Sequence, residues 1–119
     1  MSAMRRTKLR SEATQDLYQN AEVVPDFIAV EPSLREFEYW RIIANRFPYD
    51  EIATSHHMLV PKRKFAEYAE MLPEERAELD SLIAGGLEDY DTLMLNTRRG
   101  RTVLNWLHFH LLIFAVLEK

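Results

Sequence analysis

The chain of 119 residues contains no cysteine. This absence excludes a disulfide framework and any zinc site built on thiolates. A protein without disulfides is compatible with a reducing compartment, and we expect this one to be cytoplasmic. Its fold must then depend on the burial of apolar side chains, and a chain of this length can bury a sizeable core as a single domain.

Long apolar runs and an excess of positive charge are absent as well. The longest apolar stretch, residues 111–117, is too short to span a bilayer, and the basic N-terminus lacks the apolar segment of a secretory signal. The net charge of −4 argues against bulk nucleic-acid binding, which needs many cations to displace counterions from phosphates. We therefore expect neither a membrane nor bulk nucleic acid as a partner.

Histidine is scarce, and its four residues form two close groups, His56-His57 and His108/His110. The second group lies in a run of bulky β-formers, in which successive side chains of a strand would face opposite sides. The predicted cleft face consists of Trp106, His108, His110 and Leu112, and the predicted core face of Leu107, Phe109, Leu111 and Ile113. Two imidazoles about 7 Å apart on one face favour phosphate or nucleotide chemistry.

Apolar runs bounded by turn residues predict four further strands. Residues 27–30, between Pro25 and Pro32, fit a short edge strand. The other strands are expected over residues 39–45, 56–61 and 92–95, and the histidine strand over residues 103–114. A basic turn with Arg98, Arg99 and Arg101 leads into the histidine strand.

One main helix is predicted from Pro73, because a proline followed by acids favours the first helical turn. Its apolar stripe consists of Leu79, Leu82, Ile83 and Leu87. Residues 65–72 predict a shorter helical segment, and residues 11–21 a helix in an N-terminal arm, residues 1–24, that lies at the periphery or acts as a lid. Residues 25–119 then form a single domain of the α+β class with a mostly antiparallel sheet.

Three blocks of the sequence form a combined motif. Residues 106–112 place histidines at alternate positions with apolar residues between them, and Asn45 ends a predicted strand upstream. Residues 57–63 run from a histidine into a Pro-Lys-Arg turn, while Asn96 and residues 100–103 lead into the histidine strand. In this order, over residues 36–113, the blocks resemble the histidine-triad (HIT) superfamily, with Trp106 in place of the first triad histidine.

This resemblance implies a HIT-like antiparallel sheet of about five strands, with one main helix and a shorter one packed on one face. It implies a nucleotide or nucleotide conjugate as ligand, and transfer or hydrolysis at the α-phosphate through a nucleotidyl-histidine. By position His108 is the nucleophile, and His110 contacts a phosphate oxygen or supports the leaving group. The resemblance also implies that the protein is a homodimer, that it needs no cofactor, and that no metal takes part in the covalent step.

The resemblance further assigns nucleotide or phosphate contacts to a set of surrounding residues. These are Asn45, His57, Asn96, Arg101 and Trp106. The neighbouring His56 is expected to face solvent or to support a ligand residue, since adjacent strand residues point to opposite faces.

Other interpretations of the same residues remain open. His108 and His110 could be two partly buried histidines on a polar sheet face without catalysis, and the four histidines could in principle bind a metal. The arginine turn could be a solvated loop, and Trp106 could stack on a base, block the pocket or simply pack. An inactive nucleotide-binding or regulatory module with the HIT fold is the alternative to an enzyme.

Overall fold

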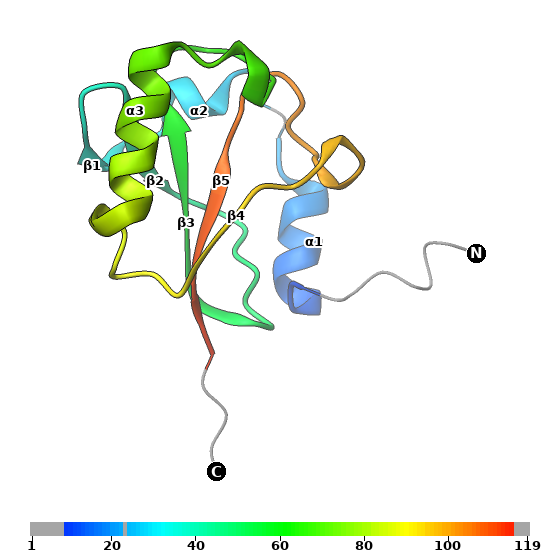
Figure 1. Cartoon of the computed structure of the whole chain (residues 1–119). Coiled ribbons are helices and arrows are strands. Elements are labelled where there is room, and N and C mark those ends of the chain that lie inside the picture. The colour runs from blue at the N-terminus through cyan, green and yellow to red at the C-terminus, as the bar shows by residue number, and fades with distance from the viewer. Residues whose placement is uncertain (1–8, 23, 116–119) are drawn as a thin grey trace.

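The computed structural model describes residues 9–22 and 24–115. Within them a five-stranded sheet has the order β1-β2-β3-β5-β4, and each neighbouring pair is antiparallel (Figure 1). The strands are β1 (Ser33–Glu36), β2 (Trp40–Ala44), β3 (Ala53–Pro61), β4 (Thr92–Met94) and β5 (Phe109–Phe114). The predicted α+β class with a sheet of about five strands is confirmed.

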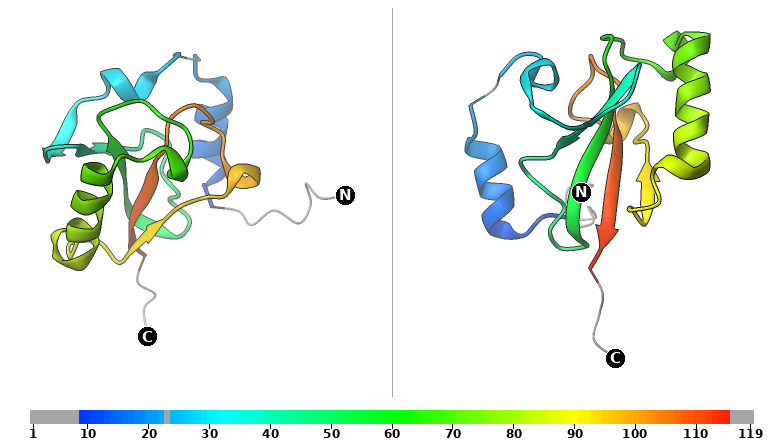
Figure 2. Two further views of the ribbon diagram at one scale, coloured as in Figure 1. Left: turned by 45° about the horizontal axis from the view of Figure 1, so that its top comes forward. Right: turned by 90° about the vertical axis from the view of Figure 1, so that its left-hand side faces the viewer.

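Helices cover both faces of this sheet. Helix α3 (Pro73–Ser81) lies on one face, and α1 (Glu12–Asn20) and α2 (Phe27–Val30) lie on the opposite face (Figure 2). Single turns of 3-10 helix occur at Tyr68–Glu70 and Arg98–Gly100, and a π turn at Leu82–Gly86 continues α3. None of the described helices is long and apolar enough to cross a bilayer.

The larger part of the core lies between the sheet and α3. The helix begins at Pro73 as predicted, and the Glu75 carboxylate accepts a hydrogen bond of 2.7 Å from the Leu72 N–H. Leu79 and Leu82 belong to a buried cluster with Trp40, Ile42, Leu59, Leu107, Phe109 and Leu111. The last three residues of this cluster confirm the predicted core face of the histidine segment.

One residue of the predicted helical stripe does not reach the core. Ile83 is 56% exposed, and it lies in the π turn at Leu82–Gly86, where the wider turn shifts side chains out of the helical phase. Upstream, residues 65–72 contain only the short turn Tyr68–Glu70, and Phe65 is buried in the core. The apolar stripe therefore marks the core face of α3, but it extends beyond the regular α-helix, which ends at Ser81.

The segment of residues 27–30 is the helical turn α2, so its prediction as an edge strand is wrong. Asp26, just before it, adopts a left-handed backbone conformation (φ 51°) that turns the chain. Ile28 is then buried with Met58, while Val30 is exposed. The edge strand is β1 instead, whose mostly exposed polar residues give no apolar alternation that would reveal a strand in the sequence.

The histidine segment becomes a regular strand only at Phe109, later than the predicted start at residue 103. Two hydrogen bonds hold the preceding residues in an irregular path: the Leu107 N–H donates to the Phe65 carbonyl (2.7 Å), and the Trp106 indole Nε1–H donates to the Pro61 carbonyl (3.0 Å). The side chains still alternate between the two faces. The other predicted strands correspond to β2, β3 and β4, and β3 begins three residues early at Ala53.

The helix predicted in the N-terminal arm is confirmed as α1. It begins after the N-cap Ser11 and buries none of its own residues. It lies next to the loop between β2 and β3, because Ser11 and Thr14 both donate hydrogen bonds to Asp50 of that loop. Of the basic residues near the N-terminus, Arg10 is described, whereas Arg5, Arg6 and Lys8 lie outside the described residues.

Candidate functional site

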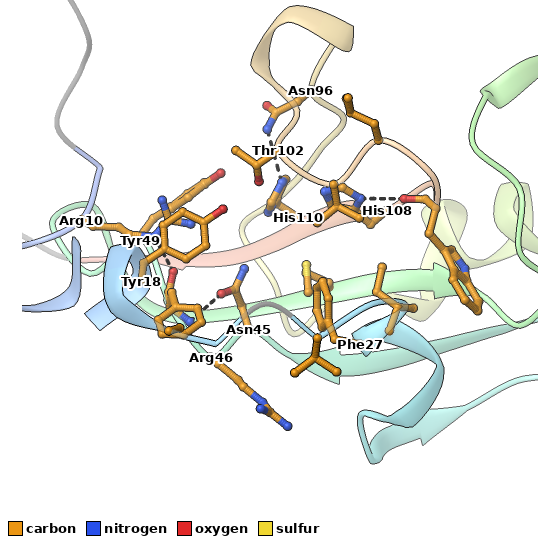
Figure 3. Close-up of a pocket in the computed structure, with 18 of the residues that line it drawn as sticks. Arg10, Tyr18, Phe27, Asn45, Arg46, Tyr49, Asn96, Thr102, His108 and His110 are labelled. Atoms are coloured by element: carbon orange, nitrogen blue, oxygen red, sulfur yellow. Dashed lines mark hydrogen bonds between the residues drawn. The ribbon is translucent and has the colours of Figure 1, made fainter. Parts of the chain in front are cut away.

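A cleft on the α1 and α2 side of the sheet contains both histidines of the C-terminal pair (Figure 3). Segments far apart in the sequence contribute to its wall. Among the lining residues are Arg10, Tyr18, Phe27, Ile28, Asn45, Tyr49, Met58, Asn96, Trp106, His108 and His110. The two predicted catalytic residues and three of the predicted binding residues therefore share one cleft.

The backbone holds His108 in a single tautomer. Its Nδ1 lies 3.0 Å from the carbonyl oxygen of Trp106, and a carbonyl can only accept a hydrogen bond, so Nδ1 carries the proton. The other ring nitrogen, Nε2, then keeps its lone pair. Because the acceptor is a backbone carbonyl, this bond does not depend on the side chain at position 106.

His110 is bonded to His56, and a backbone group decides which nitrogen of each ring carries a proton. The Tyr49 N–H donates to His56 Nδ1 (3.0 Å), so neutral His56 carries its proton on Nε2. That Nε2 lies 2.8 Å from His110 Nδ1 and donates to it. His110 therefore carries its own proton on Nε2.

The Nε2–H of His110 is a hydrogen-bond donor beside His108. The side-chain Nδ2 of Asn96 lies 3.3 Å from this nitrogen and donates to the Gly100 carbonyl at 3.5 Å, so Asn96 Nδ2 does not accept the Nε2–H of His110. The ring centroids of His108 and His110 are 5.1 Å apart. The cleft thus combines a bare imidazole nitrogen with an adjacent N–H donor, which is the pair of functions that attack on a phosphate ester requires.

Burial keeps these three imidazoles neutral at pH 7. Desolvation lowers the pKa of His110 to about 3, and His108, His56 and Arg10 add to the effect. Desolvation also lowers the pKa of His56 to about 4, and Arg10 is the next cause. The pKa of His108 is lowered by burial as well, partly opposed by its bond to the Trp106 carbonyl. Neutral rings can hold the fixed tautomers described above.

His57 lies on the opposite face of the sheet, so its predicted place beside His108 and His110 is wrong. Its Nδ1 lies 2.7 Å from the Tyr90 hydroxyl. Met58 is directly opposite His110 in the β3–β5 ladder, and directly opposed residues point to the same face. His56 shares that face by alternation, and at 3% exposure it is buried and bonded to His110, so it takes the supporting role rather than the solvent-facing one.

The arrangement of strands and helices matches solved structures of histidine-triad proteins. A "Hit Like Protein" superposes with a TM-score of 0.55 at 21% identity, covering 85% of this chain and 95% of that chain. The chain has the histidine-triad fold. A hypothetical histidine triad nucleotide-binding protein from Sulfolobus tokodaii gives 0.52 at 21% identity, covering 84% of this chain and 66% of that one.

A histidine triad protein from Clostridium difficile gives a TM-score of 0.51 at 14% identity, covering 90% of this chain and 92% of that chain. No family model and no curated protein sequence matches the chain. Identities this low make the likeness one of fold. The fold alone does not determine the chemistry of the cleft, which depends on the residues that this chain places there.

Asn45 is one of the residues that line the cleft of this histidine-triad fold. Its Oδ1 accepts a hydrogen bond from the Phe47 N–H (2.8 Å), which fixes the orientation of the amide. Its Nδ2 is 3.3 Å from His56 Nε2 and belongs to the cleft wall. Because His56 Nε2 already carries a proton directed at His110, the Asn45 amide N–H groups are donors for a ligand.

Trp106 occupies the position two residues before His108 and contributes to the cleft wall. The residue is 7% exposed, its Nε1–H is bonded to Pro61, and it packs with Met58 and Ile43. The indole N–H is therefore already hydrogen-bonded within the protein. The indole contributes apolar ring surface to the cleft wall.

Arg101, predicted to contact phosphate, does not line the cleft. Its guanidinium donates to the Ala66 carbonyl (3.2 Å) and to the Glu67 carboxylate (3.3 Å), and the side chain is only 11% exposed. Arg98 pairs with the same carboxylate at 2.5 Å. These two arginines of the basic turn therefore attach this loop to the segment before α3.

Sequence reasoning missed two cleft residues, Tyr49 and Arg10. Tyr49 acts partly through its backbone N–H, and Arg10 comes from an arm expected at the periphery or as a lid. His56 had been expected to face solvent or to support a ligand residue, and its bond to His110 fits the supporting role. Among the described residues, no three histidine, aspartate or glutamate side chains gather into a metal-binding group.

Proposed function

We propose that the protein binds a nucleotide or nucleotide conjugate and hydrolyses or transfers it at the α-phosphate through a nucleotidyl-histidine. The observation that carries this proposal is the fixed tautomer of His108, whose Nε2 keeps its lone pair inside the cleft. A neutral imidazole of this kind is a competent nucleophile at neutral pH. A solved neighbour described as a histidine triad nucleotide-binding protein supports a nucleotide as the ligand.

In the first step the lone pair of His108 Nε2 attacks the α-phosphorus and forms a P–N bond. The bond from phosphorus to the leaving group breaks, and its electron pair departs with the leaving group. Water or another acceptor then attacks phosphorus and releases its proton to solvent, while the P–N bond breaks and its electron pair returns to Nε2. No cofactor and no metal is needed for either step.

The other cleft residues bind the phosphate and the base. The Nε2–H of His110 donates to a phosphate oxygen and offsets the negative charge that grows there in the transition state. The amides of Asn45 and Asn96 supply further hydrogen bonds to phosphate or ribose. The apolar side of the cleft, formed by Phe27, Ile28, Met58 and Trp106, receives the base or an apolar part of the leaving group.

Turnover by variants of the two cleft histidines tests this mechanism. We expect His108→Ala to lower turnover of adenosine 5′-phosphoramidate and dinucleoside polyphosphates by on the order of 10³-fold or more, while AMP binding stays measurable by calorimetry. We expect His110→Ala to cost about 10²-fold in turnover and to weaken binding too, since its donor contacts the phosphate. His57→Gln is the matched control, because His57 lies on the other face.

The intermediate can be sought directly. Rapid denaturation at alkaline pH, followed by mass spectrometry, should locate a nucleotidyl group on His108 in the native protein and none in His108→Ala. Small and equal effects of the His108 and His110 substitutions on turnover would contradict the mechanism. Such effects would indicate that His108 and His110 are buried histidines with no catalytic role.

The inactive nucleotide-binding module is the second candidate, and the buried Trp106 is the observation that favours it. Its indole occupies part of the cleft wall at the position that, by resemblance, would hold a histidine. The enzyme proposal predicts that Trp106→His changes the relative kcat/KM among substrates without creating activity. If the native protein binds nucleotides but turns over none, and Trp106→His alone starts hydrolysis, the inactive module is the better description.

We also propose a homodimer, from the resemblance to the superfamily. Light scattering coupled to size exclusion at micromolar concentration would show a particle of twice the chain mass. A monomer under these conditions would remove the dimer from the proposal and leave the chemistry of His108 unaffected.

A further inference from the structure

Arg10 is a cationic side chain of the cleft, and among the described residues only neutral groups hold its guanidinium. Its Nε–H donates to the Phe47 carbonyl at 2.7 Å. Its guanidinium carbon lies 4.5 Å from the centroid of the Tyr18 ring and 4.9 Å from that of Tyr49. Within the described residues, Arg10 has no carboxylate at salt-bridge distance and its two terminal nitrogens have no hydrogen-bond acceptor.

The other arginine on the cleft wall, Arg46, is paired with a carboxylate. Arg46 lies 2.8 Å from the Glu31 carboxylate, and its side chain is 59% exposed. The carboxylates on the wall belong to Asp26, which pairs with Lys64 at 2.9 Å, and to Glu22, which is exposed. The half-buried Arg10 is thus the lining arginine whose charge the described residues leave unneutralised.

The Tyr49 ring fixes where Arg10 lies relative to the histidines. This ring stacks on His110, with centroids 5.2 Å apart and an angle of 28°, and Arg10 lies over the same ring (Figure 3). The charge of Arg10 contributes to the lowered pKa of His110 and of His56, as expected for a cation at close range. A phosphate beside His110 and an anion beside Arg10 would therefore be neighbouring groups of one ligand.

The loop between β2 and β3 holds Arg10 in this position. The Asp50 carboxylate accepts hydrogen bonds from the Ser11 N–H (2.6 Å), the Ser11 hydroxyl (2.8 Å) and the Thr14 hydroxyl (2.6 Å). On the other side of Arg10, the Leu9 carbonyl accepts from the Glu51 N–H at 2.9 Å. These bonds fix the backbone on both sides of Arg10. Its guanidinium therefore loses little conformational freedom when it binds an anion.

We propose that Arg10 binds a second anionic group of the ligand, so that the substrates are nucleotide derivatives whose leaving group itself carries a phosphate. This inference rests on the proposed function for the position of the α-phosphate at His108. It separates polyphosphate and phosphate-bearing leaving groups, which Arg10 would bind through its fork of N–H donors, from amines and other neutral groups. It also gives helix α1 a function, which is to hold Arg10 at the cleft.

Binding of inorganic pyrophosphate tests the anion site without any nucleotide. Calorimetry should show pyrophosphate binding to the native protein and to Arg46→Gln, the matched control that removes the other arginine of the same wall. Arg10→Gln should weaken pyrophosphate binding by about tenfold or more, as expected for the loss of charge-assisted hydrogen bonds. Arg10→Lys, which keeps the charge but not the fork, should bind with intermediate affinity, and circular dichroism would show that each variant is folded.

Kinetics with two classes of leaving group complete the test. Arg10→Gln should lower kcat/KM for a dinucleoside polyphosphate by about tenfold or more, and kcat/KM for adenosine 5′-phosphoramidate by less than about threefold. An equal loss with both substrates, or no pyrophosphate binding by the native protein, would overturn the role of Arg10 while leaving the test of His108 intact. Pyrophosphate binding that depends on Arg10, in a protein without nucleotide turnover, would support the anion site and reject the proposed reaction.

Discussion

At the scale of single residues, the chemistry of the cleft depends on which ring nitrogen carries each proton. Two backbone groups decide this: the Trp106 carbonyl accepts from His108, and the Tyr49 N–H donates to His56. Neither bond requires a particular side chain at residue 106 or 49. The two histidines of the C-terminal pair consequently differ in tautomer, with the proton of His108 on Nδ1 and that of His110 on Nε2, although the sequence presents them as equivalent members of an alternating pattern.

Nuclear magnetic resonance of the imidazole nitrogens can test this assignment. At pH 7 we expect the Nδ1–H tautomer for His108 and the Nε2–H tautomer for both His56 and His110, because each is imposed by a neighbour that can only accept or only donate. His56 and His110 should remain neutral down to well below pH 6.5, and burial lowers the pKa of His108 from its ordinary value as well. A protonated or rapidly exchanging His110 at pH 7 would contradict the hydrogen-bond chain through His56.

The same chain makes His56 a positioning residue for His110. We expect His56→Phe to keep a ring in the site but to release His110 into a mixture of tautomers, with turnover lower by about 10²-fold. The pKa of His110 should rise, since the nearby His56 is one of the causes that lower it. His57→Gln, one residue away on the other face, should change neither the tautomer signals nor turnover by more than about threefold.

At the scale of elements, α1 differs from α3 in what holds it. Helix α3 buries Leu79 and Glu75, whereas α1 buries none of its residues and is attached through Asp50. Hydrogen bonds from Ser11 and Thr14 lower the pKa of Asp50 to about 2, so its carboxylate is charged at neutral pH. An element held by a few polar contacts at the surface belongs to the low-stability part of a fold.

Removing this attachment should loosen α1 locally. We expect Asp50→Ala to raise the rate of hydrogen exchange and of proteolytic cleavage in residues 9–22 by about an order of magnitude, the effect of losing charge-assisted hydrogen bonds. Pyrophosphate binding through Arg10 should weaken in parallel. Asp91→Ala is the matched control, because Asp91 accepts a backbone N–H from Phe114 on a different part of the surface. Unchanged protection of α1 in Asp50→Ala would show that other contacts hold the helix.

At the scale of the whole molecule, the buried histidines connect the site to stability. His56 and His110 have pKa values near 4 and 3 in the folded protein, against an ordinary value of 6.5. Between the folded pKa values and 6.5, the unfolded chain therefore binds more protons than the folded protein. The contribution of the two neutral rings to the free energy of unfolding is complete above about pH 6.5 and is lost as the pH falls towards the folded pKa values. The burial that keeps these imidazoles neutral also makes the fold sensitive to acid.

Urea unfolding at a series of pH values would measure this coupling. Between pH 6.5 and 4.5 we expect the free energy of unfolding to fall, with a slope that approaches about 1.4 kcal/mol per pH unit for each such histidine. Carboxylates such as Asp50 and Glu75, whose pKa values are lowered, lose their contribution only at still lower pH. A double variant, His56→Phe with His110→Asn, should flatten the slope in this window, and an unchanged slope would assign the acid sensitivity elsewhere.

Local patterns in the sequence determined much of this protein. The start of α3 at Pro73, the helix in the N-terminal arm, and the opposite faces of Leu107 and His108 all follow from interactions between residues close in the chain. The bond from His108 to the Trp106 carbonyl also spans only two residues. Properties of this kind can be predicted because turn chemistry and side-chain alternation are local.

Only the tertiary structure decided which residue of the His56-His57 pair contacts His110 and which arginine lines the cleft. His56 rather than His57 faces His110 because β3 and β5 pair with Met58 opposite His110, and a register one residue different would reverse the choice. Arg10 reaches the cleft while Arg101 does not, because Asp50 holds α1 beside the β2–β3 loop and Glu67 holds the arginine turn. Register and loop attachment are set by residues that lie dozens of positions apart, so no local pattern in the chain contains them.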